Sequence, residues 1–129
     1  MPKLDFLGIT VLGDYILCEG PDAIVANLLR VGATAVACNP TVTAPGDEAT
    51  GSFQPPIDAG SSPRVFDRPL FGKHSLWVRS GVSYHPRHEL YADSAYAARK
   101  PNDLTEEHGA VIGEFIRRAV DAGLKVYLQ

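Results

Sequence analysis

The sequence predicts an α/β fold built on a parallel sheet. Short apolar runs alternate with amphipathic segments, and the helix-to-strand passages Arg30–Val36 and Asp121–Val126 share one form: a helix end, a glycine, and a buried strand. Alternating strands and helices are typical of parallel sheets with right-handed crossovers. Short helix-to-strand loops are the usual joints of such units. We therefore expect a single domain over residues 1–129.

The first βα unit begins with the apolar run 6–12, which is typical of a strand buried on both faces. Gly13-Asp14 is expected to end this strand as a turn. Pro21 suits the first position of a helix, so we predict a helix over 21–31 with Gly32 after its end. Small and β-branched residues then predict a second strand over 34–39.

The next helix and strand are predicted over 104–122 and 125–129. Asp103–Glu106 has the form of a capping box, and the apolar side chains that follow recur at helical spacing: Leu104, His108, Val111, Ile112, Phe115, Ile116 and Ala119. The third strand carries an unpaired edge. We expect more chain to follow and cover it, or a partner to do so, including a second copy through self-association at this edge.

A long segment, 40–101, separates the second strand from that helix and lacks strong periodicity. Its first half is rich in turn residues, as in Asp58–Pro63. Its second half holds most of the aromatic residues and three of the four histidines, and Leu76–Arg79 could form a short strand. A structureless segment of this length is uncommon unless it is functional, so we expect an ordered loop that packs over something.

Composition and charge exclude several classes of function. The chain is 45% apolar and 21% charged with a formal net charge of −3. No run of basic residues exceeds a pair such as Arg117-Arg118, which provides no footprint for nucleic acid. The start, Met1–Asp5, lacks the apolar stretch of a secretion signal, and no apolar run approaches the ~20 residues of a membrane span. We expect a cytoplasmic protein with no membrane partner, in which Cys18 and Cys38 are reduced and buried.

Two segments resemble a known family. Gly32–Pro40, a glycine leading into a strand that ends in Asn-Pro, is similar to the second strand of amylase-like glycoside hydrolase barrels. Ile112–Leu128 resembles their next helix and third strand, and glycosyl-hydrolase-like barrels more broadly. The resemblance covers about half of the chain and implies a partial (β/α)8 TIM barrel: the first three strands and two helices, with a long loop after the second strand. The family's catalytic carboxylates belong to later strands, and Gln129 stands where the family pattern continues to an Asp.

If the chain has this fold, its site lies at the carboxyl ends of the strands, where barrel enzymes place their active sites. The long loop follows the second strand and lies on the same side. Aromatic rings cover the apolar face of a sugar, while polar side chains bond its hydroxyls. The candidate contacts to a carbohydrate or other small polar substrate are Asp14, Tyr15, Asn39, Trp77, Arg79, Tyr84, His85 and Gln129. Trp77 and Tyr84 could instead anchor the loop.

The sequence contains no complete catalytic constellation and no signature of a cofactor. No glycine-rich nucleotide motif is present, and Pro86 argues against a helical metal pair at His85 and His88. Glycoside hydrolysis requires two facing carboxyl groups, of which the strand ends supply only Asp14. The leading hypothesis is a glycoside-hydrolase-like barrel that is inactive in this portion. A sugar isomerase or epimerase barrel, and a non-catalytic sugar-binding or structural fragment, remain alternatives.

Overall fold

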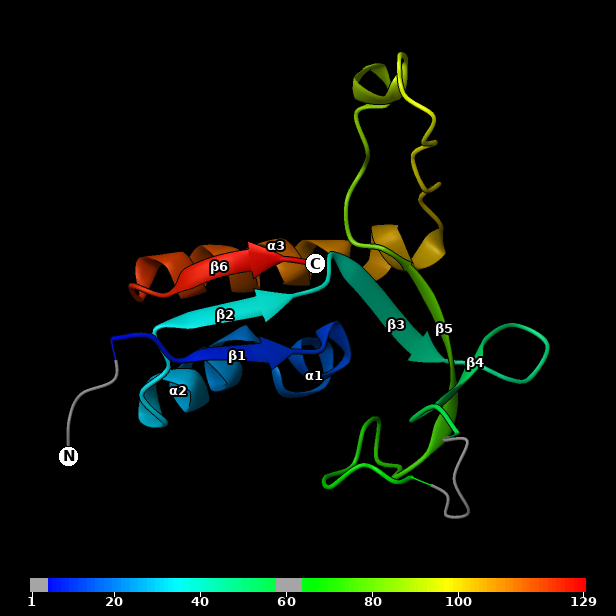
Figure 1. The fold of residues 1–129 in the computed structure, drawn as a ribbon. Helices are drawn as coiled ribbons and strands as arrows, with labels where there is room; N and C mark the ends of the chain where they lie inside the picture. Colours follow the sequence, from blue (N-terminus) through cyan, green and yellow to red (C-terminus); the bar gives the residue numbers. More distant parts are fainter. Residues whose placement is uncertain (1–4, 58–63) are drawn as a thin grey trace.

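The computed structural model describes residues 5–57 and 64–129 and shows a mixed α/β fold with two small sheets (Figure 1). The predicted α/β class is therefore confirmed. The first four residues and the turn-rich run 58–63 lie outside the described residues. No helix in the described part of the chain is long and apolar enough to cross a bilayer.

The first sheet contains the three strands that the sequence predicted. These are β1 (Gly8–Val11), β2 (Ala35–Cys38) and β6 (Lys125–Leu128), all parallel and in the order β1-β2-β6. The register places Ile9, Val36 and Val126 side by side in one row across the sheet. The order in space is thus the order along the chain.

Three helices pack on this sheet, one more than expected. The two predicted helices are α2 (Pro21–Arg30) and α3 (Asp103–Asp121), and between β1 and α2 lies α1 (Gly13–Glu19). The expected turn at Gly13-Asp14 is therefore wrong, because the chain begins a helix there. Gly13 suits this corner because a Cβ atom would lie 2.6 Å from the Thr41 carbonyl oxygen, and Ile16, which follows, is completely buried.

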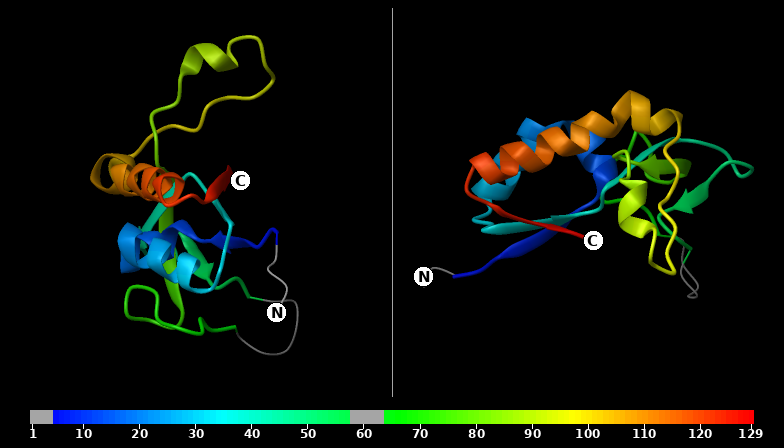
Figure 2. Two further views of the ribbon diagram at one scale, coloured as in Figure 1. Left: turned by 90° about the vertical axis from the view of Figure 1, so that its left-hand side faces the viewer. Right: turned by 90° about the horizontal axis from the view of Figure 1, so that it is seen from above.

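The helices cover one face of the parallel sheet and leave the other open (Figure 2). The covered face meets the helices through a core of fully or nearly buried side chains, among them Val36, Cys38, Ile24, Leu28 and Phe115. Because side chains alternate along a strand, the row of Thr10, Ala37 and Tyr127 points to the other face. Thr10 and Tyr127 are exposed, and Ala37 is partly so.

The long segment after β2 was expected to be an ordered loop, and the structure corrects this expectation, because the segment contains a second sheet. It contains β3 (Thr41–Pro45), β4 (Ser52–Gln54) and β5 (Leu76–Val82), which form an antiparallel sheet in the order β3-β5-β4, and a short 3₁₀ turn at His88–Tyr91. The suggested strand at Leu76–Arg79 is confirmed as part of β5. Figure 1 shows this second sheet beyond the tips of the parallel strands, so the segment does lie at their carboxyl ends.

The start of α3 differs from the predicted capping box in one position. Asn102, not Asp103, is the capping residue: its Oδ1 accepts from the backbone N–H groups of Leu104 (3.0 Å) and Thr105 (3.4 Å), and the Thr105 hydroxyl accepts from the Asn102 N–H at 3.0 Å. The Asn102 amide also donates to the Ser80 carbonyl at 3.1 Å. This one side chain therefore ties the helix to β5.

We expect Asn102→Ala to lower the free energy of unfolding by about 1–2 kcal/mol, because it removes a helix cap. Asn102→Ser keeps a capping oxygen and loses the amide donor to Ser80, so it should cost about half as much or less. Urea denaturation measures both. Equal losses for the two variants would show that the cap does not carry the effect.

Candidate functional site

Two residues that were predicted to contact a sugar lie close together at the carboxyl ends of β2 and β6. Asn39 follows β2 and Gln129 follows β6, and the Gln129 N–H donates to the Cys38 carbonyl at 3.1 Å. Asn39 is half-buried and Gln129 is exposed. The second sheet begins directly after Asn39, at Thr41. Both residues lie at the carboxyl ends of their strands, as the sequence predicted, and the second sheet that begins nearby was not predicted.

Asp14 has a structural partner. The Thr43 hydroxyl donates to Asp14 Oδ1, and this hydrogen bond joins the first turn of α1 to β3. The carboxylate is thus already engaged between two elements. This contact gives Asp14 a structural role at the joint between α1 and the second sheet.

Tyr15 carries the most distinctive arrangement at this end of the sheet. Its ring lies edge-on to Phe66 with centroids 6.2 Å apart, and the Arg68 guanidinium sits 4.7 Å from its ring centroid. The Tyr15 hydroxyl donates to the Arg68 carbonyl at 3.2 Å, and Arg68 Nε pairs with Glu19 at 3.0 Å. Burial raises the pKa of the Tyr15 phenol, although Arg68 opposes this shift. The ring is therefore a neutral platform under a cation at ordinary pH.

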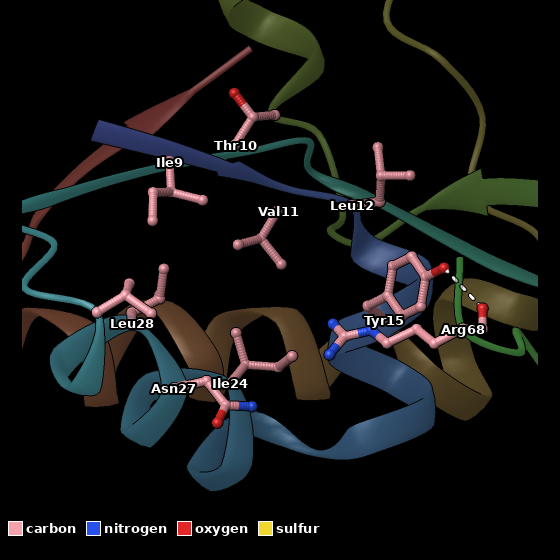
Figure 3. A pocket seen from close by; sticks show the side chains of 10 residues that line it. Ile9, Thr10, Val11, Leu12, Tyr15, Ile24, Asn27, Leu28 and Arg68 are labelled. Carbon is pink, nitrogen blue, oxygen red and sulfur yellow. Dashed lines mark hydrogen bonds between the residues drawn. The ribbon is translucent and has the colours of Figure 1, made fainter. Parts of the chain in front are cut away.

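This platform borders two hollows. One, of about 390 Å³, lies between β1 and α2 (Figure 3); apolar side chains form most of its wall, and its polar members besides Tyr15 are Thr10, Asn27 and Arg68. The other, of about 750 Å³, is an open and more polar depression on the side of the long segment, and it is lined by Phe66 and Asp67 among others. Tyr15 and Arg68 belong to both hollows.

Trp77 and Arg79 on β5 lie elsewhere and have partners within the fold. The Trp77 ring packs edge-on against Phe53 of β4 with centroids 5.5 Å apart. Arg79 makes a bidentate ion pair with Asp103, at 2.9 and 2.8 Å, which fixes the start of α3 to the second sheet. This geometry favours the anchoring interpretation for Trp77 and gives Arg79 a structural role.

Tyr84 and His85 form a third group beside α3. His85 Nε2 lies 2.9 Å from a carboxylate oxygen of Glu106, and Tyr84 lines an apolar groove that also contains Leu128. The predicted contacts are therefore not one cluster. The structure distributes them among the strand ends, the Tyr15 platform, β5 and the α3 surface.

Sequence reasoning missed Arg68, Asn27 and Thr10 as members of the Tyr15 site. The chain separates Tyr15 from Arg68 by 53 positions, and no spacing rule connects them. The abundance of aromatic residues in the long segment was the only available signal, and it indicated Phe66 at most. Contacts between residues so far apart in the chain can be identified only when the fold is known.

Metal-ligating residues do not gather within the described parts of the chain, where no group of three His, Cys, Asp or Glu side chains could hold an ion. Both cysteines are free thiols, but only Cys38 is buried as expected, while Cys18 is exposed on α1. Partial desolvation raises the pKa of both thiols. Neither has the lowered pKa that characterises a reactive cysteine.

The Arg79–Asp103 ion pair makes the stability of the fold depend on pH, and the direction of this dependence follows from the pKa of Asp103. Hydrogen bonds from Arg79 hold the pKa of the Asp103 carboxyl below its usual range. A lowered folded-state pKa stabilises the fold above the unfolded pKa of about 3.9, and this contribution is lost as the pH falls through the folded value. We expect Asp103→Asn to lower the Tm at neutral pH, and the difference from wild type should shrink progressively as the pH falls below about 3.9.

The control for this prediction repeats the Asp103 substitution in a protein from which the Arg79 cation has already been removed. In an Arg79→Gln background, Asp103→Asn should have a smaller effect at neutral pH, because the pair is already broken. A Tm difference between wild type and Asp103→Asn that is the same at every pH would contradict this account.

Comparisons with protein-family models, with curated protein sequences and with solved structures give no match. No relative therefore assigns a role to the Tyr15 platform or to the strand-end residues. Their chemistry is defined by the contacts and charges of this chain alone.

Proposed function

We propose that this chain is the first part of a carbohydrate-active, glycoside-hydrolase-like (β/α)8 barrel, and that it binds a sugar at the carboxyl ends of its parallel strands. The observation that carries the proposal is the Tyr15 platform at that end of the sheet. Support for the barrel part comes from the topology of the first sheet.

Two features of the parallel sheet favour a barrel over a doubly wound sheet. Its strands follow the chain order β1-β2-β6, and its helices lie on one face. A doubly wound sheet reverses its strand order and carries helices on both faces, whereas a barrel keeps its helices outside and fills its interior with side chains. The open face, with Gly8, Thr10, Ala35, Ala37, Lys125 and Tyr127, would be the interior.

The Tyr15 platform offers the two kinds of contact that a sugar ring requires. The rings of Tyr15 and Phe66 provide apolar surface in the wall of the depression, and Arg68 and Asp67 in the same wall provide charged groups for hydroxyls. Arg68 is oriented by Glu19 and by the Tyr15 ring, so little side-chain entropy is lost when a ligand binds. A neutral, polyhydroxylated ring with one apolar face fits this surface.

Binding without hydrolysis is the expected behaviour of this chain. Hydrolysis requires two carboxyl groups about 5–9.5 Å apart across one bond. Asp14 is held by Thr43, Glu19 by Arg68, and Asp103 by Arg79. Each of these carboxylates therefore has a structural partner. The isomerase or epimerase alternative remains distinguishable by metal content, because those sites commonly use a bound ion.

Titration calorimetry with mono- and oligosaccharides tests the binding. We expect Arg68→Ala to weaken binding about tenfold, because it removes a charge-assisted donor. Tyr15→Leu should weaken it as well, because it removes the ring. Tyr96→Ala is the matched control, since Tyr96 is the most exposed tyrosine of the described residues (79%). Binding that is unchanged in Arg68→Ala and Tyr15→Leu would reject this site.

An activity assay on aryl glycosides and oligosaccharides tests the second half of the proposal. The 129-residue chain should show no useful turnover. Asp14→Asn should not differ from wild type, because the Asp14 carboxylate accepts a hydrogen bond from Thr43 and does not act on a glycosidic bond. Robust turnover that disappears in Asp14→Asn would show a working carboxylate pair within these residues.

A further inference from the structure

We propose that Glu19 makes the Tyr15 platform select uncharged sugars over acidic ones. This inference rests on the proposed function, because it concerns the ligand of the same site. An acidic sugar carries a carboxylate, and a guanidinium without a carboxylate partner in the protein would favour it. In this chain the Arg68 guanidinium already has such a partner, which is Glu19.

Glu19 and Tyr15 hold Arg68 from one face of the same helix. Glu19 is the last residue of α1 and follows Tyr15 by about one helical turn, so the two side chains are neighbours on the helix surface. Glu19 Oε1 lies 3.0 Å from Arg68 Nε, and the Tyr15 ring centroid lies 4.7 Å from the guanidinium carbon. Figure 3 shows this guanidinium beside the Tyr15 ring. A carboxylate and a ring of one helix therefore fix a cation that comes from a distant loop.

Glu19 is placed to act on the charge of the site rather than to contact the ligand. Arg68 lines the open depression of about 750 Å³, whereas Glu19 lines a separate hollow that also contains Cys18 and Phe71. The Glu19 side chain is 25% exposed, and that of Arg68 is 54% exposed. A carboxylate that is mostly withdrawn from water interacts more strongly with a neighbouring cation than an exposed one does. Glu19 therefore offsets the charge of Arg68 while the guanidinium remains in the wall that a ligand meets.

The charges around this depression balance when Glu19 is included. The wall contains two arginines, Arg64 and Arg68, and one aspartate, Asp67, and Glu19 provides the second carboxylate. The opposing charges act on the platform itself, because burial raises the pKa of the Tyr15 phenol, Arg68 lowers it, and Glu19 and Asp67 raise it. Removal of the Glu19 charge would leave the wall with an excess of positive charge, which attracts anionic ligands.

This arrangement favours an uncharged ring for a direct chemical reason. A sugar hydroxyl accepts a hydrogen bond from the oriented guanidinium and brings no charge of its own. A uronate would have to share Arg68 with Glu19 or displace it, and two carboxylates at one cation repel each other. The same repulsion applies to sulfated and phosphorylated sugars. Neutral sugars are therefore the substrate class that this site accepts.

Titration calorimetry with matched probes tests this role of Glu19. The probes are galactose and galacturonate oligosaccharides, and mannose and mannuronate oligosaccharides, each pair with the same length and linkage. Wild type should bind the neutral member of a pair more tightly at low salt and about pH 8, above the ordinary range of histidine titration. Glu19→Gln keeps an oxygen for Arg68 but removes the charge, so its affinity for the uronate should rise about fivefold or more, with no such rise for the neutral sugar. Salt at about 0.5 M should remove most of this gain by screening.

Three further variants separate the charge of Glu19 from its place in the fold. Glu89→Gln makes the same change in net charge on the 3₁₀ turn after β5 and should keep the wild-type preference. Glu19→Asp keeps the carboxylate and should keep the preference as well. Arg68→Ala in the Glu19→Gln background should lose the gain in uronate affinity, because both substitutions act on one ion pair. The Tm of each variant is measured, and the ratio of the two affinities decides, since partial unfolding lowers both affinities alike.

Several outcomes would overturn this role of Glu19: an unchanged preference in Glu19→Gln, an equal gain in Glu89→Gln, or a gain that survives the loss of Arg68. Each of them occurs in a protein that binds neutral sugar, so it leaves the proposed function intact. Failure of the proposed function looks different, because no neutral sugar then binds wild type. In that case, a uronate that binds Glu19→Gln but not wild type would still support the charge effect, and its absence would reject both proposals.

Discussion

The burial of β2 is the constraint on which the rest of this structure depends. Val36 and Cys38 are completely inaccessible to solvent, because β1 and β6 flank the strand and the helices cover it. A strand enclosed in this way must bond its backbone on both sides, which places β2 at the centre of the parallel sheet, between β1 and β6. The helices then share one face, and the second sheet follows directly from the end of β2 at Asn39.

Much of the parallel unit could be predicted from the sequence because its signals are local. Apolar runs, Pro21 at a helix start and glycine after each long helix specify their own elements. The α1 helix was missed because Gly13-Asp14 has the composition of a turn, and only its close approach to Thr41 shows why glycine is needed there. The antiparallel sheet was missed because β4 and β3 are short and their pairing partner β5 lies far along the chain.

The candidate site shows the same division between local and long-range information. The strand ends at Asn39 and Gln129 followed from the fold rule for parallel sheets. Arg79 and Trp77 were candidate sugar contacts from residue type and from the place of their loop after the second strand, with anchoring of the loop as the alternative for Trp77. Their partners Asp103 and Phe53 give them structural roles. The Tyr15 platform depends on Arg68, which the fold brings over the ring from a distant loop. Side-chain partners of this kind are not encoded in spacing.

The central claim is that the carboxyl ends of the parallel strands bind a sugar, and amide chemical-shift mapping by NMR tests it most directly. During titration with an oligosaccharide, the largest shifts should occur at Tyr15 and at 66–68, with smaller shifts near Asn39. Residues at the opposite ends of the strands, such as Ala35 and Lys125, should not move. Saturable shifts confined to those opposite ends, or to the far surface of α2, would contradict the account.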